Sequence, residues 1–134
     1  MTATYELTFD LSSHQLINAN VRLHWREDRK RSRDLRAVAG WQARAARIPG
    51  LTSARIVARV TWPDARRRDA HNLGPTGKHL IDGLVDAGVL PDDSDRHLIG
   101  PDWRTTDEPL PRSQWLVAGT VPTTRIVLEI TDTG

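Results

Sequence analysis

The stretch ARIVARVTWPDARRRDAHN, residues 54–72, joins a segment of alternating hydrophobicity directly to a cluster of charged residues. Alternation with a period of two is typical of a half-buried β-strand. The inward positions of this strand are Ile56, Ala58, Val60 and Trp62. Pro63 ends the strand, and three adjacent arginines, an aspartate and a histidine follow. Loops at strand ends commonly carry functional residues on a rigid scaffold, so this stretch indicates both the fold and a site.

Hydrophobic periodicity also predicts the secondary structure on both sides of residues 54–72. Alternation predicts strands over residues 4–11 and 124–131, and shorter strands near 96–104 and 115–120. A helical period predicts one helix from about residue 30 to 48, with Leu35, Val38, Ala39, Ala45 and Ala46 as its apolar stripe. A second helix is predicted over about 76–87, before the acidic loop LPDDSD. We expect residues 1–134 to form a single compact α+β domain with a mixed β-sheet and two main helices.

Composition narrows the class of protein. The 134 residues include no cysteine, which excludes disulfides and thiolate metal sites and favours a reducing cytoplasm. No apolar run is long enough to cross a membrane, and the first residues do not resemble a signal peptide. We therefore expect a soluble cytoplasmic protein without a membrane partner. Most of the five tryptophans lie at predicted strand positions and are expected in the core.

The formal net charge of +2 conceals a strong segregation of charge along the chain. Residues 22–68 carry fourteen Lys or Arg against four Asp or Glu, whereas residues 69–108 carry three against nine. A basic half followed by an acidic segment suits a protein that holds phosphates and acts on them, although two solvated faces would give the same count. On the polar face of the first predicted helix lie Arg29, Arg33, Arg36, Arg44 and Arg47.

Six residues are candidates for the chemistry: Asp69, His71, Lys78, Asp82, Asp92 and Asp93. A helix that returns its chain can bring the segment after the strand close to the acidic loop. Clustered carboxylates repel one another and are usually held by a divalent cation. Mg²⁺ takes one or two carboxylates together with water and substrate phosphate oxygens, and such sites hydrolyse phosphodiesters through activated water.

Each candidate also has a purely structural interpretation. Asp69 fits a turn or capping residue, and Asp93 lies in a common type of loop sequence. Lys78 and Asp82 stand four residues apart on a helix, which is the spacing of an ordinary ion pair. Lysine is scarce in this chain, however, with two lysines against seventeen arginines. A lysine retained in such a composition indicates a need for a compact ammonium donor.

The segment WPDARRRDAHNL…KHLIDGLVDAGVLPDDSD, residues 62–95, resembles the core of the RusA family of Holliday junction resolvases. The family pattern is a strand, P-D-x-R-R-R-D-x-D-N-L, a lysine-bearing helix with D-x-L, and then A-G-x-x-x-D-D. The resemblance covers about a quarter of the chain. It implies a homodimer that binds four-way DNA junctions and cuts symmetrically paired strands with Mg²⁺ or Mn²⁺.

The resemblance also implies roles for individual residues. Asp69 matches the first metal aspartate, Asp93 the third, and Lys78 the catalytic lysine. Two departures stand out. The residues GPT after Leu73 lengthen the approach to the lysine by three, and His71 stands where the family has its second aspartate. Because neutral imidazole suits Mn²⁺ better than the harder Mg²⁺, a site with His71 is expected to favour Mn²⁺.

The sequence thus predicts a RusA-like endodeoxyribonuclease that resolves branched DNA in recombination and repair, encoded by a phage or prophage in a bacterial host. Asp69, His71 and Asp93 would hold the metal, and Lys78 would stabilise charge on the phosphate or protonate the leaving oxygen. Phosphate contacts would come from Arg33, Arg36, Arg44, Arg66, Arg67 and Arg68. The alternatives are a catalytically impaired protein that binds junctions and a basic protein that binds a protein partner.

Overall fold

Strand β2, Ala54–Thr61, lies inside a four-stranded mixed sheet in the computed structural model, which describes residues 2–134. The strand order is β1-β4-β2-β3, where β1 is Thr4–Ser12, β4 is Thr123–Asp132 and β3 is Leu98–Thr105. The β1–β4 and β4–β2 pairs are antiparallel, and β2 and β3 are parallel. Parallel neighbours need a crossover connection, which the helix between them supplies. The predicted α+β fold with a mixed sheet is confirmed.

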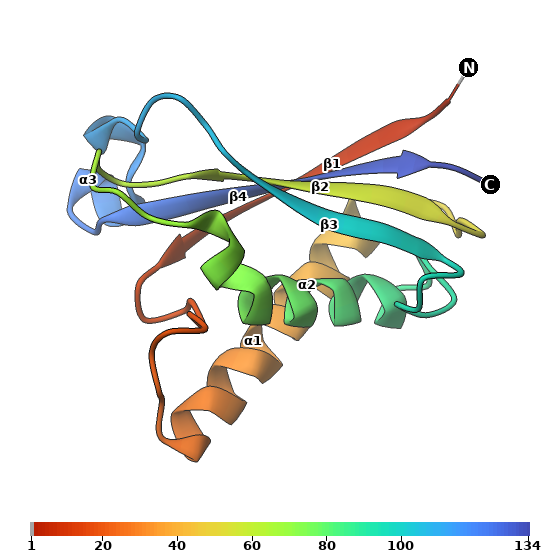
Figure 1. The fold of residues 1–134 in the computed structure, drawn as a ribbon, viewed down its shortest axis with the longest axis horizontal. Helices are drawn as coiled ribbons and strands as arrows, with labels where there is room; N and C mark the ends of the chain where they lie inside the picture. Colours follow the sequence, from red (N-terminus) through yellow and green to blue (C-terminus); the bar gives the residue numbers. More distant parts are fainter. Residues whose placement is uncertain (1) are drawn as a thin grey trace.

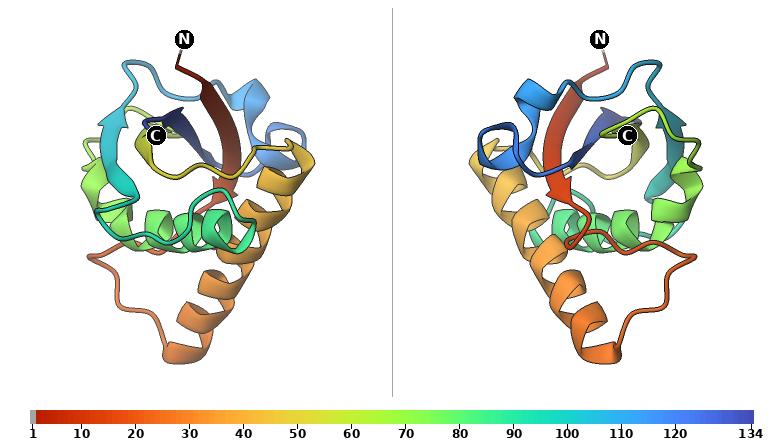
Figure 2. Two further views of the ribbon diagram at one scale, coloured as in Figure 1. Left: turned by 90° about the vertical axis from the view of Figure 1, so that its right-hand side faces the viewer. Right: turned by 90° about the vertical axis from the view of Figure 1, so that its left-hand side faces the viewer.

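The two long helices, α1 (Trp25–Ala45) and α2 (Gly74–Asp86), cover the same face of the sheet (Figures 1 and 2). The predicted inward side chains of β2 are buried, and the same holds for Leu7 and Phe9 of β1 and for Ile126, Leu128 and Ile130 of β4. These side chains form one core with Leu35 of α1 and Leu80 and Leu84 of α2. The N-terminal half of α1 extends away from the sheet (Figure 2).

Helix α1 begins five residues earlier than the sequence predicted, at Trp25. The ring of His24 accepts a hydrogen bond from the N–H of Arg26 (3.1 Å), and two acidic residues stand in the first turn, where they favour a helix start. The C-terminal part of the predicted stripe was wrong, because Ala45 and Ala46 are exposed. The buried face of α1 is narrower than predicted and consists of Leu35, Ala39, Gly40 and Ala43.

Residues 115–120 do not form the predicted strand. They contain a short helical turn, α3 (Leu116–Gly119), which follows the 3₁₀ turn η2 (Arg112–Gln114). Val117 and Ala118 have positive φ angles of 52° and 51°, so the chain reverses too tightly for an extended segment. A single bridge between Leu116 and Val121 closes the reversal.

Two of the five tryptophans, Trp62 and Trp103, are buried. Trp115 is half-buried, whereas Trp25 and Trp41 lie exposed on α1, so the expectation that most tryptophans belong to the core was wrong. Both exposed side chains follow from the placement of α1, which packs on the sheet and α2 along only one face. None of the helices in residues 2–134 combines the length and apolar character that a membrane span requires.

Candidate functional site

The arginine loop, residues 63–68, is organised by a single carboxylate. The backbone N–H of Arg66 and the guanidinium of Arg68 donate to Asp64 Oδ1 at 3.0 and 2.7 Å. These hydrogen bonds, that of Arg68 first, hold the pKa of Asp64 well below its usual value of 3.8. The Cζ atom of Arg68 also lies 5.1 Å from the centroid of the Trp62 ring, in cation–π contact. Arg68 is therefore committed to the fold of the loop.

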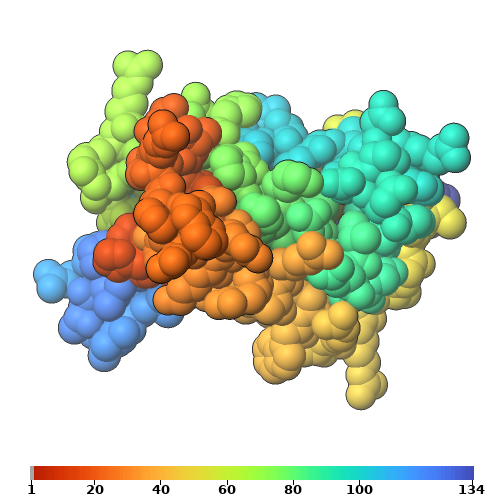
Figure 3. Space-filling view, turned by 90° about the horizontal axis from the view of Figure 1, so that it is seen from below, coloured from red at the N-terminus to blue at the C-terminus, as the bar shows by residue number. Residues whose placement is uncertain are grey.

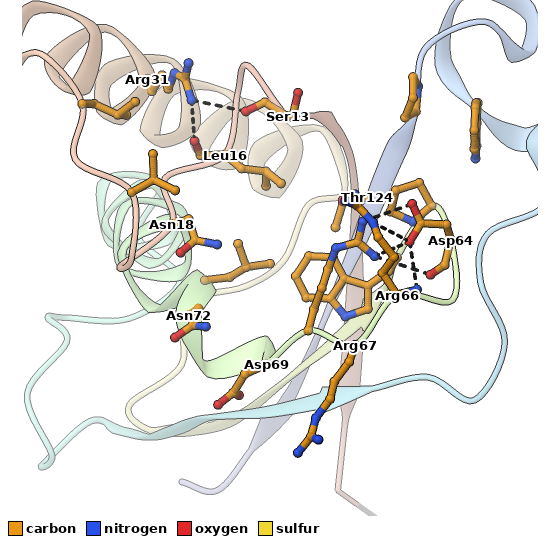
Figure 4. A pocket seen from close by; sticks show the side chains of 18 residues that line it. Ser13, Leu16, Asn18, Arg31, Asp64, Arg66, Arg67, Asp69, Asn72 and Thr124 are labelled. Atoms are coloured by element: carbon orange, nitrogen blue, oxygen red, sulfur yellow. Dashed lines mark hydrogen bonds and ion pairs between the residues drawn. The ribbon is translucent and has the colours of Figure 1, made fainter.

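The other two arginines of the loop remain available for a ligand. Arg66 reaches Asp64 at 3.3 Å, but its side chain is 77% exposed. Arg67 is exposed and makes no ion pair within residues 2–134. Figure 4 shows the side chain of Arg67 extending away from the loop, with Asp69 nearby. The cluster thus contains one structural arginine and two that can bind phosphate.

Asp69 and His71 form a pair at the start of the 3₁₀ helix η1 (Ala70–Leu73), which leads directly into α2. Asp69 Oδ1 accepts a hydrogen bond from the backbone N–H of His71 (2.9 Å) and lies 3.0 Å from the ring Nδ1 of the same residue. The hydrogen bond from the His71 backbone, followed by that from its ring, lowers the pKa of Asp69. With Nδ1 turned to Asp69, the ring presents Nε2 to an incoming group.

Lys78 connects α2 with the acidic loop that follows it. Its Nζ atom lies 3.3 Å from Asp93 Oδ2 and 3.7 Å from Asp82 Oδ1. The second contact is the ion pair that the four-residue spacing predicts. Asp92 points elsewhere, because it caps the turn by accepting a hydrogen bond from the N–H of Ser94 (2.8 Å), and hydrogen bonds from Ser94 lower its pKa. The return of the chain after α2 therefore does bring Asp93 to Lys78.

The two pairs lie in two neighbouring hollows that share one side chain. Asp69 and His71 line the first hollow, Lys78 and Asp93 line the second, and Trp103 of β3 lines both. The ring of Trp103 packs closely against α2 at Gly77. This packing requires glycine, since an added Cβ would stand 2.9 Å from Trp103 Cη2. Among residues 2–134 no three Asp, Glu or His side chains converge closely enough to hold a metal ion by themselves.

The arginines of α1 divide into two groups. Arg36 and Arg44 are bound to the C-terminal end of α2, where Arg36 Nη2 donates to Asp86 Oδ1 (2.7 Å) and Arg44 Nη2 to the backbone oxygen of Asp86 (3.1 Å). The hydrogen bond from Arg36 lowers the pKa of Asp86. Arg33 is 74% exposed and has a single long contact with Asp34 at 3.6 Å. Of the three α1 arginines predicted to bind DNA, Arg33 is thus the one not engaged in helix packing.

A cavity of about 620 Å³, which we call the loop pocket, lies between residues 13–24 and the arginine loop. In the space-filling view these two segments lie next to each other (Figure 3). Residues 13–24 are fixed by Thr76, whose hydroxyl bonds both the N–H and the C=O of Ile17 at 2.8 Å, and by Arg31, which donates to the backbone oxygen of Leu16 (2.8 Å). Asp69 lies at the edge of this pocket (Figure 4).

The loop pocket and its residues Asn18, Arg31 and Asn72 were not predicted from the sequence. A weak signal was present, because polar amide and hydroxyl residues are frequent in the stretch SSHQLINAN, residues 12–20. Comparison with models of known protein families and with curated proteins found no match to this chain.

Proposed function

We propose that this chain is a metal-dependent endodeoxyribonuclease that cuts Holliday junctions and other branched DNA, as its resemblance to the RusA family implies. One observation carries the proposal. The Asp69–His71 pair and the Lys78–Asp93 pair lie in hollows that share Trp103, and the first pair directly follows the arginine loop. Carboxylates, an imidazole and an ammonium next to phosphate-binding arginines suit phosphodiester hydrolysis.

The donor atoms fit a divalent cation of the Mg²⁺ or Mn²⁺ type. Asp69 Oδ2, His71 Nε2 and Asp93 Oδ1 have no hydrogen-bond partner within residues 2–134, and all three side chains are substantially exposed. Such cations take a few protein ligands and complete their shell with water and phosphate oxygens, so three preassembled side chains are not required. When bound by Asp69 and His71, with Asp93 as the third expected ligand, the cation would supply Lewis acidity and an activated water.

Lys78 supports the same chemistry from the second hollow. Its side chain is 62% exposed, and its ammonium lies within ion-pair distance of both Asp82 and Asp93. A compact, oriented ammonium can stabilise the negative charge that develops on a phosphate or protonate the leaving oxygen.

The arginines supply the grip on DNA in this proposal. Arg66, Arg67 and Arg33 are the exposed candidates, and contacts from such side chains to phosphate oxygens position a duplex without reading its sequence. The symmetric cutting expected of a resolvase also requires two active sites, so the proposal includes a homodimer. A phage or prophage gene expressed in the cytoplasm of a bacterial host is the setting that the resemblance implies.

Cleavage of a synthetic four-way junction tests this function. The wild type should nick paired strands at symmetric positions in Mg²⁺ or Mn²⁺, while Asp69→Asn and Asp93→Asn should bind the junction but fail to cut it. Asp92→Asn is the matched control and should cut normally, because Asp92 caps a turn and does not contact Lys78. Wild-type protein that shifts the junction without nicking it would indicate the catalytically impaired binding protein. A lack of salt-sensitive DNA binding would indicate a protein that binds a protein partner.

A further inference from the structure

The loop pocket has two chemically different sides. In Figure 4 the amides of Asn18 and Asn72 lie on one side and Arg66 and Arg67 on the other, with Asp69 at the edge. Leu16, Leu23 and Trp62 add apolar surface to the lining of the pocket. A pocket with apolar walls and a few placed polar groups is typical of a site for an organic ligand.

The side-chain amides of Asn18 and Asn72 are not fully hydrogen-bonded within the fold. The side chain of Asn72 makes no hydrogen bond within residues 2–134, although its backbone C=O accepts one from Ala19 (2.8 Å). Asn18 uses its Oδ1 for the N–H of Asn20 (2.8 Å), and its NH₂ group has no partner in the same described range. Each amide therefore has hydrogen-bonding capacity left for a ligand.

We propose that the loop pocket receives one nucleotide that has left the base stack, with its base towards Asn18 and Asn72 and its phosphate towards Arg66 and Arg67. Asparagine amides match the paired donor and acceptor atoms on a base edge, and guanidinium groups match phosphate oxygens. Asp69, at the edge of the pocket, then stands beside that phosphate. This inference rests on the proposed function, because it adds a base-recognition site to the same nuclease.

A branched substrate suits such a pocket better than a regular duplex. A base inside a duplex is stacked and paired, and extracting it costs a few kcal/mol, whereas bases at a branch point are already partly unstacked. The pocket would therefore favour branched DNA over duplex and would place one nucleotide next to the metal-binding pair. The same contacts would give the enzyme a preference for particular bases at the cut, because an amide discriminates between base edges.

Binding of abasic junctions tests the pocket without requiring catalysis. A set of four-way junctions carries one abasic residue each, stepped outward from the branch point, and affinities are measured in EDTA. At one position, loss of the base should weaken wild-type binding by about fivefold or more. Asn72→Ala should weaken binding of the intact junction by a similar factor and leave binding of that abasic junction unchanged.

Asn20→Ala is the control, because Asn20 lies in the same loop, is exposed and does not line the pocket. It should behave as the wild type on every junction. The inference is overturned if no abasic position matters, or if Asn72→Ala weakens intact and abasic junctions equally. The effect of Asn72→Ala is expected to depend on the presence of one base. Wild-type cleavage without this dependence would contradict the proposed pocket alone. The dependence without any cleavage would contradict the nuclease function and leave a site that binds branched DNA.

Discussion

Helices α1 and α2 pack closely at Gly83, and replacing this glycine tests the helix layer on which the site is built. A Cβ added to Gly83 would stand 2.7 Å from Ala39 Cβ and 2.9 Å from the backbone N of Gly40, and it would also clash with the backbone oxygen of Arg36. Two of these three atoms belong to the α1 backbone. Side-chain rotation cannot relieve such contacts, so Gly83→Ala must push the helices apart.

Two opposing effects set the change in the free energy of unfolding of Gly83→Ala. Alanine is favoured over glycine inside a helix by about 1 kcal/mol. Overpacking a close-packed interface costs roughly 1–3 kcal/mol, and more where the backbone has to move. Because the obstacle here is backbone, we expect a net destabilisation of about 1–3 kcal/mol. For a domain of this size about 4 °C is lost per kcal/mol, so the Tm should fall by roughly 4–12 °C.

The loss of stability is measured by thermal unfolding of Gly83→Ala, with Gly74→Ala as the control variant. Gly74 is the first residue of α2, has helical φ and ψ angles, and has no heavy atom within 4 Å of an added Cβ. Gly74→Ala should therefore keep or raise the Tm. A Gly83→Ala variant that melts at or above the wild-type temperature would refute the close crossing of the two helices.

Four further results are expected. Lys78→Arg should cut about 100-fold more slowly in a gel cleavage assay while binding normally, because a guanidinium cannot replace an ammonium in position or acidity. Arg67→Ala should reduce the salt dependence of binding without changing the Tm, whereas Arg68→Ala should lower the Tm. Asp64→Asn should melt below the wild type at pH 7, and the difference should shrink as the pH falls below 3.8, because the lowered pKa of Asp64 stabilises the fold only while the carboxylate is charged. His71→Asp should shift the preference in cleavage from Mn²⁺ towards Mg²⁺.

Three of these results have contrary outcomes that would change the assignment of a residue. Full activity of Lys78→Arg would reduce Lys78 to an ion-pair partner of Asp82. Equal metal preference before and after His71→Asp would mean that the imidazole does not touch the cation. A constant difference in Tm between Asp64→Asn and the wild type from pH 7 to pH 2 would show that the charge of Asp64 is not what stabilises the arginine loop.

The strands could be predicted from the sequence because a sheet with one buried face gives a strict alternation of side chains. Helix α1 was located less well, since its start depends on His24, which is not among the usual capping residues, and its first turn carries no apolar period. The reversal at residues 116–119 was missed for another reason. Apolar residues in positive φ conformations are rare, so Val117 and Ala118 give no signal of a turn.

In the candidate site, contacts between residues close in sequence could be predicted, whereas contacts that depend on tertiary packing could be predicted only in outline or not at all. The pairing of Asp69 with His71 and of Lys78 with Asp82 follows from short spacings in the sequence. The contact of Lys78 with Asp93 could be expected in outline, because a helix followed by a returning loop brings the two segments together. The loop pocket could not be predicted, since it depends on side-chain bonds to the backbone of residues 13–24 that leave no period in the sequence.

The arginine loop shows why counting charges along a sequence overestimates the contacts with DNA. Six arginines were candidates for phosphate binding, but Arg68 is held by Asp64, and Arg36 and Arg44 are held at the end of α2. Each phosphate neutralised on duplex DNA contributes about −0.9 to the slope of log affinity against log salt. The three exposed candidates that remain would give a slope of about −3 per subunit. Arg67→Ala should make that slope less steep by about one, because one phosphate contact is lost. Arg68→Ala should act mainly through the stability of the loop. If both variants change the slope equally, Arg68 leaves Asp64 when DNA binds, and the three neighbouring arginines act as one phosphate-binding cluster.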